Sequence, residues 1–299
     1  MKKASDLDVR ERFLWGDKEL AAVLEEALVV RSDPDRLTHG FHTYPAGLHP
    51  DAAKLVIEAV GTGRMFDPFC GGGTTLVEAR VAGLEAIGRD LSPIALRVAR
   101  ARAGTPDDAT VSRFRSTARK LVEVARQARD LPEEREALEP WYATHTLWEL
   151  ESLRRGIHEA EPHVQDLLWV TLSSLLIKVS WRKSDTSMKR EKHKRPPGTA
   201  AILFHKKARE LGRRIEALRA VVPEGTPEPV VEEGDARSMD LAPVQTIVTS
   251  PPYPSTYDYL PLQHLRSIWL PDSRPDFDSE IGPRRAWRRG TRDATKQWK

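Results

Sequence analysis

The fold of this chain is constrained most by three consecutive glycines, residues 71–73, which stand between a strand-like and a helix-like segment. The preceding residues 64–69 (RMFDPF) are mainly apolar, and residues 74–82 (TTLVEARVA) carry apolar side chains at helical spacing. Because glycine lacks a Cβ atom and adopts positive φ readily, the backbone of such a turn can approach a ligand closely. The following helix N-terminus offers unpaired N–H groups to an anion. The alternative is a tight strand-to-helix turn that binds nothing.

Two acidic residues follow other predicted strands. Residues 84–90 (LEAIGRD) end on Asp90, where a βαβ nucleotide-binding unit commonly places the acceptor for its ribose hydroxyls. Residues 230–235 (VVEEGD) end on Asp235, which we expect to accept a hydrogen bond from an adenine amino group. Either aspartate alone is equally well explained as a helix N-cap. Their shared position after a strand favours a ligand role for both.

A second constraint comes from residues 244–250 (VQTIVTS), which predict a buried strand. Pro251 and Pro252 end this strand because proline cannot donate to a β-ladder. The rigid turn presents the Ser250 hydroxyl, the Pro251 carbonyl and the Tyr253 ring, which suit a planar base held by its amino edge and its face. The alternative is a proline stop followed by a packed tyrosine.

Residues 67–75 (DPFCGGGTT) and 250–253 (SPPY), in this order, resemble the cofactor and catalytic motifs of the bacterial and archaeal DNA methyltransferases that modify exocyclic amino groups. Residues 41–50 (FHTYPAGLHP) resemble the segment that packs over the methionine end of S-adenosylmethionine in this N4-cytosine and N6-adenine family, although a plain loop explains them nearly as well. The resemblance implies an α/β fold with a Rossmann-like class I SAM-dependent methyltransferase sheet, and S-adenosylmethionine as cofactor. The cofactor-binding residues are then Tyr44, Pro45, Asp67, Pro68, Phe69, Gly71, Gly73, Thr74, Thr75, Asp90 and Asp235.

The same resemblance implies that Ser250, Pro251, Pro252 and Tyr253 are catalytic. In the mechanism that this resemblance implies, the methyl group would pass directly to the amino nitrogen of a base swung out of the duplex, and positioning would supply most of the acceleration. Serine at the first motif position is more often associated with N4-cytosine, so we expect cytosine N4 in preference to adenine N6. The family mechanism uses no thiolate, which leaves Cys70 as a small turn residue. The alternatives are an RNA amino-methyltransferase and a catalytically inactive nucleic-acid-binding protein.

Helical patterns dominate the middle of the chain, between the second and third predicted strands. A segment of this length exceeds an ordinary crossover, so residues 108–221 are expected to form a helical insertion, the candidate target-recognition subdomain. Residues 1–107 then hold the N-terminal segment and the SAM-binding half. Residues 222–299 return to the catalytic sheet and end in a basic tail. We expect the core of the insertion to include Trp141, Trp148 and Trp169, and the alternative is that they stack on bases.

Basic residues are concentrated in two places. Residues 178–195 contain eight Lys or Arg and two acids, which predicts an exposed basic loop that contacts phosphates, or simply a solvated charged loop. A second cluster of arginines flanks Trp287. The expected partner is double-stranded DNA, and the expected contacts are Lys178, Trp181, Arg182, Lys183, Lys189, Arg190, Arg284, Arg285 and Arg288.

The composition sets further limits. A chain of 299 residues can form one large domain or two smaller ones, and its net charge of +3 does not by itself indicate nucleic acid. The single cysteine excludes a disulfide framework within the chain and favours a reducing compartment. No segment approaches the roughly 20 apolar residues of a membrane span. We therefore expect a cytoplasmic protein without membrane or metal.

The residues after Tyr253 depart from the family pattern. Residues 257–270 predict a helix, and the rest are rich in charged residues and proline instead of the further buried strands that the resemblance implies. The sheet is therefore expected to be incomplete after the catalytic strand, in a split, truncated or degenerate enzyme. An apolar edge left in this way would favour a second polypeptide or a homodimer that completes the sheet.

Overall fold

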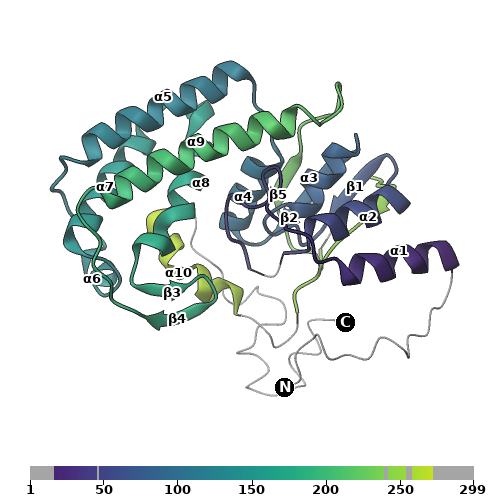
Figure 1. Cartoon of the computed structure of the whole chain (residues 1–299), viewed down its shortest axis with the longest axis horizontal. Helices are drawn as coiled ribbons and strands as arrows, with labels where there is room; N and C mark the ends of the chain where they lie inside the picture. The colour runs from purple at the N-terminus through teal and green to yellow at the C-terminus, as the bar shows by residue number, and fades with distance from the viewer. Residues whose placement is uncertain (1–16, 46, 239–241, 254–257, 272–299) are drawn as a thin grey trace.

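A computed structural model describes residues 17–45, 47–238, 242–253 and 258–271 of the chain (Figure 1). A parallel sheet with its covering helices forms one side of the molecule, and a group of longer helices forms the other (Figure 1). The α/β class expected from the sequence is confirmed, and the mostly parallel sheet fits a Rossmann-like arrangement.

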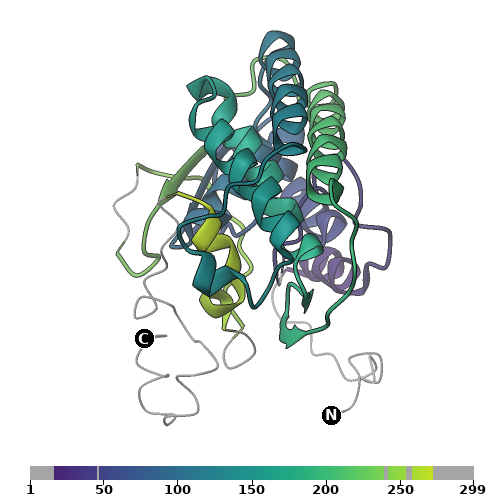
Figure 2. The same cartoon turned by 90° about the vertical axis from the view of Figure 1, so that its left-hand side faces the viewer.

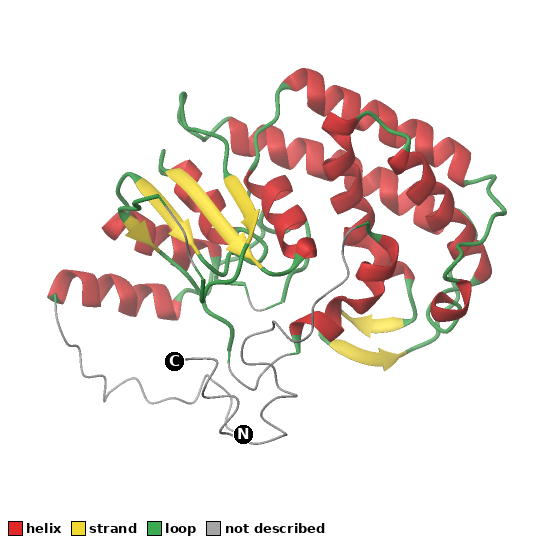
Figure 3. Cartoon of the chain, turned by 180° about the vertical axis from the view of Figure 1, so that it is seen from behind, coloured by secondary structure: helices red, strands yellow, loops and turns green. Residues whose placement is uncertain are grey.

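The main sheet has four parallel strands in the order β5-β2-β1-β6 (Figure 3). Asp67 at the end of β1 lies opposite Gly88 of β2, and Asp90 at the end of β2 lies opposite Glu233 of β5. The strand order reverses between β1 and β6, and open α/β sheets bind ligands beyond the carboxyl ends of the strands at such a point. The bounds are β1 Arg64–Asp67, β2 Glu85–Asp90, β5 Val230–Glu233 and β6 Thr246–Ile247.

Helix α4 is shared between two hydrophobic cores. Leu96, Ala99 and Ala103 pack into the core beneath the sheet, whereas Ile94 and Val98 pack into the core of the helical side. The helix starts sharply because Ser92 accepts a hydrogen bond from the Ala95 N–H and a proline occupies the first turn. The helices of the sheet side are α1 Lys18–Val29, α2 Pro50–Val60, α3 Thr74–Val81 and α4 Pro93–Ala103.

The helical side is built around α8, which is buried on nearly its whole circumference (Figures 1 and 2). A short antiparallel hairpin, β3–β4, connects α8 to α9, and α10 packs against α8 and α4. The helices are α5 Asp108–Ala125, α6 Arg135–Leu138, α7 Thr144–His158, α8 Pro162–Val179, α9 Thr199–Arg219 and α10 Tyr259–Trp269, and the hairpin strands are β3 Arg182–Ser184 and β4 Ser187–Arg190.

The predicted buried strand over residues 244–250 is wrong in its extent. Strand β6 spans two residues and pairs with β1 at one end of the sheet order. Thr246 and Val248 are buried, but the Ile247 side chain between them is 57% exposed, because alternate side chains of a strand point to opposite faces. Strand β6 is therefore a short strand, the last of the described sheet, and it takes up only part of the predicted run.

The three tryptophans expected in the helical core differ in their surroundings. Trp169 is 2% exposed and belongs to the core, as predicted. Trp141 packs against the core from its border, with the Arg190 guanidinium 5.6 Å from its ring centroid. Trp148 is partly exposed and lies 5.1 Å from the Arg129 guanidinium, so its placement in the core was wrong.

Candidate active site

One pocket lies at the carboxyl ends of the sheet strands, where the strand order reverses. It brings together residues from segments that are far apart in the sequence, namely the segment before α2, the glycine turn, the end of β2 and the proline turn after β6. Of the predicted cofactor and catalytic residues, the pocket is lined by Tyr44, Pro45, Asp67, Pro68, Phe69, Gly71, Thr74, Thr75, Asp90, Ser250 and Pro252.

Four predicted residues do not line this pocket. Gly73 has a φ of +77°, and a Cβ atom there would meet the Ala99 Cα at 2.9 Å, so this glycine permits close packing of α3 on α4. The Asp235 carboxylate lies 2.5 Å from the Arg237 guanidinium, and its two neighbours in the chain line the pocket instead. Pro251 is exposed, and Tyr253 is 48% exposed beside the pocket-lining Pro252.

The Asp67 carboxylate joins the two predicted motifs. One oxygen accepts hydrogen bonds from the Phe69 N–H at 3.0 Å and the Thr249 hydroxyl at 2.6 Å, and the other accepts from the Thr75 hydroxyl at 2.5 Å. Burial raises the pKa of Asp67, and these three donors oppose that shift. Asp67 thus holds the glycine turn against the residue that precedes Ser250. Sequence reasoning missed Thr249, although its hydroxyl directly precedes the proline turn.

Asp90, at the end of β2, bonds to the glycine turn from the side opposite Asp67. Its Oδ2 accepts a hydrogen bond from the Gly71 N–H at 3.0 Å, and its Oδ1 accepts one from the Ser92 N–H at 2.8 Å. Burial raises its pKa to about 6, with a smaller contribution from the nearby Asp67 carboxylate. Each carboxylate oxygen has two lone pairs, so Asp90 keeps acceptor capacity for ligand hydroxyls.

This pKa leads to a testable pH dependence. Ligand hydroxyls bind best to the ionised carboxylate, so the affinity for S-adenosylhomocysteine is expected to fall as the pH drops below about 6, by up to about tenfold per pH unit. Titration calorimetry between about pH 5 and pH 7.5 measures this. Asp90→Asn should bind more weakly and lose the dependence, whereas Asp235→Asn, the control, should keep it. A flat wild-type profile would contradict a ligand role for Asp90.

The glycine turn itself is tightly enclosed. Gly71 has a φ of +48°, and a Cβ atom there would lie 3.3 Å from the Tyr44 ring. The Cys70 side chain is 4% exposed, and burial, followed by the charge of Asp90, raises the pKa of its thiol well above the usual value. Cys70 is therefore held as a neutral thiol, which agrees with its interpretation as a small turn residue.

The predicted basic loop forms the hairpin β3–β4 and the segment that follows it. Lys183, Lys189 and Arg190 are exposed on this hairpin, and the Lys192 ammonium lies 4.9 Å from the Trp181 ring centroid. A second pocket beside the hairpin is lined by the cationic side chains of Lys178, Lys183, Lys192 and Arg195 and by the His193 ring. The predicted Arg284, Arg285 and Arg288 lie outside the described residues.

Arg182 corrects the expectation that the whole basic segment is exposed. It is 3% exposed, and its guanidinium donates hydrogen bonds to the carbonyls of Ser187 and Leu262 at 2.8 and 2.6 Å. Its location at the base of the hairpin explains this burial, because it fills the space between the hairpin and α10. Arg182 thus stabilises the hairpin from inside and is not presented to phosphates.

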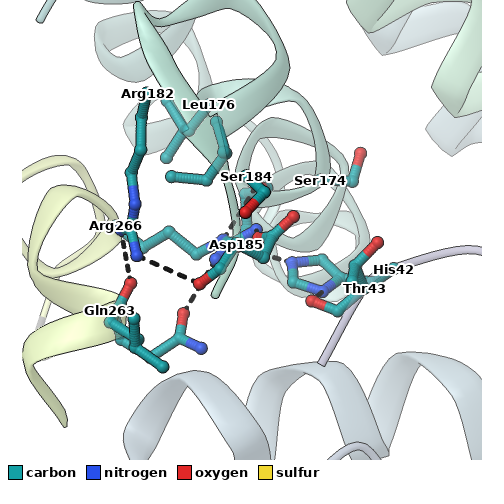
Figure 4. A network of polar contacts seen from close by, with 12 residues as sticks. His42, Thr43, Ser174, Leu176, Arg182, Ser184, Asp185, Gln263 and Arg266 are labelled. Carbon is teal, nitrogen blue, oxygen red and sulfur yellow. Dashed lines mark hydrogen bonds and ion pairs between the residues drawn. The ribbon is translucent and has the colours of Figure 1, made fainter. Parts of the chain in front are cut away.

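A buried polar network connects the hairpin to the pocket side of the molecule (Figure 4). Arg266 of α10 forms an ion pair with Asp185 at the hairpin turn and donates to the Ser173 carbonyl at 3.2 Å. The His42 ring lies 2.9 Å from the Ser173 hydroxyl, and burial holds its pKa well below the usual value. His42 stands two residues before the pocket-lining Tyr44, so the network anchors that segment.

Two absences concern only the part of the chain that the structure describes. Within it, no group of three or more His, Cys, Asp or Glu side chains is placed to hold a metal ion. No described helix combines the length and apolar character that crossing a membrane requires.

Comparison with known proteins gives one partial similarity. The chain is 34% identical over 89 residues to the Type II methyltransferase M.MvaI of Kocuria varians. The aligned region is 28% of this chain and 20% of that relative, so the chain covers about a fifth of the relative's length. No protein-family model and no solved structure matches the chain. The similarity supports a methyltransferase family and does not distinguish cytosine N4 from adenine N6.

Proposed function

We propose that this chain belongs to a DNA methyltransferase that transfers a methyl group from S-adenosylmethionine to an exocyclic amino group, at N4 of cytosine in preference to N6 of adenine. The observation that carries the proposal is the pocket that the glycine turn after β1 shares with Ser250 and Pro252 after β6. The similarity to a Type II methyltransferase supports methyl transfer, and it favours DNA over RNA as the acceptor.

The residues of the pocket fit S-adenosylmethionine, which supplies an electrophilic sulfonium methyl group when bound. Gly71 and Gly72 let the backbone approach a ligand without Cβ atoms in the way. Asp90 offers carboxylate lone pairs to the ribose hydroxyls. Tyr44 lies against the turn at the side proposed for the methionine moiety. Asp235, which is engaged by Arg237, would have to exchange that partner to reach an adenine amino group.

The proline turn is proposed to hold the target base. The Ser250 hydroxyl and the Pro251 carbonyl accept hydrogen bonds from the amino group, which draws its nitrogen toward tetrahedral geometry and exposes the lone pair. The exposed Tyr253 ring stacks on the base after it leaves the duplex. One amino proton is released to solvent once the nitrogen carries the methyl group, and no side chain becomes covalently attached.

The exposed cations of the hairpin are proposed to contact DNA phosphates. Replacing Lys183 and Lys189 by glutamine should weaken duplex binding and lower the slope of log K against log salt by about 0.9 for each phosphate that is no longer neutralised. Helix α5 lies on the far side of the helical group from the hairpin (Figure 1), and its exposed Arg119 and Lys120 provide a control pair with the same loss of charge. If both double variants showed the same slope of log K against log salt, the hairpin would be a solvated surface without phosphate contacts.

The edge of the sheet supports the proposal of a completing partner. Strand β6 is the last strand of the described sheet, and its Ile247 side chain is 57% exposed on one face of that sheet beside the edge. A second polypeptide or a second copy of the chain would cover this edge. Size-exclusion chromatography with light scattering distinguishes the two, because a homodimer forms from the chain alone.

Transfer of labelled methyl from S-adenosylmethionine to duplex DNA and to total RNA tests the function directly. The modified nucleosides are identified by mass spectrometry after digestion. We expect N4-methylcytosine from DNA, whereas N6-methyladenine would correct the base and a product in RNA would favour the RNA enzyme. Cofactor binding without any product would indicate a missing partner or a non-catalytic role.

A further inference from the structure

Arg102, in the last turn of α4, lines the candidate active site and carries a charge that the described protein does not neutralise. Its side chain is 5% exposed. Among the described residues its guanidinium makes one hydrogen bond, from Nη2 to the His39 Nδ1 at 3.2 Å, and its Nε is buried without a partner. No sequence pattern marks this residue, since it is one of several arginines on a helix.

The surroundings of Arg102 explain why its charge stays uncompensated. His39 lies 2.5 Å from Glu78 through its other ring nitrogen, so the nitrogen facing Arg102 acts as a neutral acceptor. Burial lowers the pKa of His39, which keeps the ring uncharged. The buried Glu78 carboxylate is engaged by His39 and by Arg36, whose Nη2 lies 2.8 Å from it. No carboxylate of the described residues lies within ion-pair distance of Arg102.

An unpaired buried cation is unfavourable, because it has lost hydration without gaining an anion. Burial lowers the pKa of Arg102 to about 10, with a smaller contribution from Arg214, so the side chain still carries its proton at neutral pH. An anion that enters the pocket therefore lowers the free energy of the site, because it neutralises this buried charge. The pocket wall at Arg102 is, on this ground, an anion-binding position.

The position of the guanidinium indicates which part of a ligand it meets. A Cβ atom on Gly72 would lie 2.6 Å from the Arg102 Nη1 and 3.1 Å from the Tyr44 Cβ, so both side chains flank the same glycine. Asp90, which would repel an anion, contacts the turn at Gly71 instead. Helix α3 begins next to this glycine, and its N-cap residue, Gly73, provides no side-chain cap. The first N–H groups of α3 therefore add a favourable electric field for an anion.

We propose that Arg102 binds the α-carboxylate of the methionine moiety of S-adenosylmethionine and so selects cofactors that carry this group. The inference rests on the proposed function, since it assigns one contact within the same cofactor site. A guanidinium fits a planar carboxylate with two donors, which a lysine ammonium does not reproduce. The glycine at position 72 leaves the space in which guanidinium and carboxylate meet.

Titration calorimetry with two ligands tests this contact independently of catalysis. The ligands are S-adenosylhomocysteine and its decarboxylated analogue, which lacks only the carboxylate. The wild-type chain should bind S-adenosylhomocysteine about 10- to 100-fold more tightly than the analogue. Arg102→Met should reduce this preference to about twofold or less and leave the affinity for the analogue nearly unchanged. Arg102→Lys should keep part of the preference, because it retains the cation.

The controls separate a binding role from a structural one. Arg97→Gln removes a cation from the same helix, one that pairs with Asp166 at 2.8 Å, and should keep the full preference. Arg102→Met replaces an uncompensated buried charge by an apolar chain, so its melting temperature without ligand should be equal to or above that of the wild type. A lower melting temperature together with an equal loss for both ligands would instead make Arg102 a structural residue.

The remaining outcomes are also decisive. Wild-type protein that binds both ligands with equal affinity would overturn this inference and leave the proposed function intact. Wild-type protein that binds neither ligand would contradict the proposed function and, with it, the role of Arg102. An unchanged preference in a folded Arg102→Met variant would likewise overturn the inference.

Discussion

Replacement of Ser250 by alanine is expected to lower the rate of methyl transfer by about 10²- to 10³-fold, the usual effect of removing one preorganised hydrogen-bond partner from a reacting group. The Kd for S-adenosylhomocysteine should stay within about twofold of the wild-type value. The physical reason is that the proposed partner of the hydroxyl is the amino group of the base. The substitution removes one oxygen atom from the pocket and leaves the glycine turn and Asp90 in place.

Single-turnover rates with saturating DNA measure this effect, and titration calorimetry measures cofactor binding separately. Tyr253 provides the companion pair of variants. Tyr253→Phe keeps the ring and should retain most of the activity, whereas Tyr253→Ala loses the stacking surface and should act much more slowly. If Ser250→Ala transferred methyl groups at the wild-type rate, the hydroxyl would have a structural role, and the proposed orientation of the base would lose its support.

Replacement of Gly71 by valine is expected to abolish measurable cofactor binding, with a loss of at least about 100-fold in affinity. The residue has a φ of +48°, where a β-branched side chain is strained, and a Cβ atom would stand 3.3 Å from the Tyr44 ring. The Gly71 N–H also donates to Asp90 at 3.0 Å. A shift of the backbone at this point would therefore move the carboxylate proposed for the ribose together with the wall of the pocket.

A matched control separates backbone strain from the loss of the site. Gly225 has a φ of +82° and no atom within 4 Å of a Cβ position, so Gly225→Val carries similar strain at a residue that does not line the pocket. Both variants should lose about 1–2 kcal/mol of unfolding free energy, but Gly225→Val should bind S-adenosylhomocysteine normally. Normal binding by folded Gly71→Val protein would identify the glycine turn as a purely structural feature.

Asp67 shows how the two motifs are made into one site. Its carboxylate accepts from Thr75 at the start of α3 and from Thr249 before the proline turn. Hydrogen bonds to a buried carboxylate are stronger than those between neutral groups, so this residue fixes the distance between the two halves of the pocket. Cofactor binding by Asp67 stays a prediction from the sequence, whereas the structure shows that its carboxylate joins Thr75 to Thr249.

Local signals explain which parts of the fold could be predicted. The strand, glycine turn and helix at residues 64–81 follow from apolar periodicity and from the conformational freedom of glycine, both of which act within a few residues. The helices α5 and α8 follow from helical spacing in the same way. The extent of β6 did not follow, because an apolar run predicts a buried segment but does not show how many of its residues pair with a neighbouring strand.

The sequence by itself determined the α/β class and the identity of most pocket-lining residues, and it predicted the chemistry of the glycine and proline turns, since each depends on local backbone preferences and on functional groups. Only the tertiary structure decided that Arg182 is buried beneath the hairpin, that Thr249 bonds to Asp67, and that Arg102 stands at the pocket wall with no carboxylate partner among the described residues. Each of these three side chains makes a hydrogen bond to a residue 63 to 182 positions away in the chain. Burial and charge compensation depend on how such distant segments pack together, so no local sequence pattern predicts them.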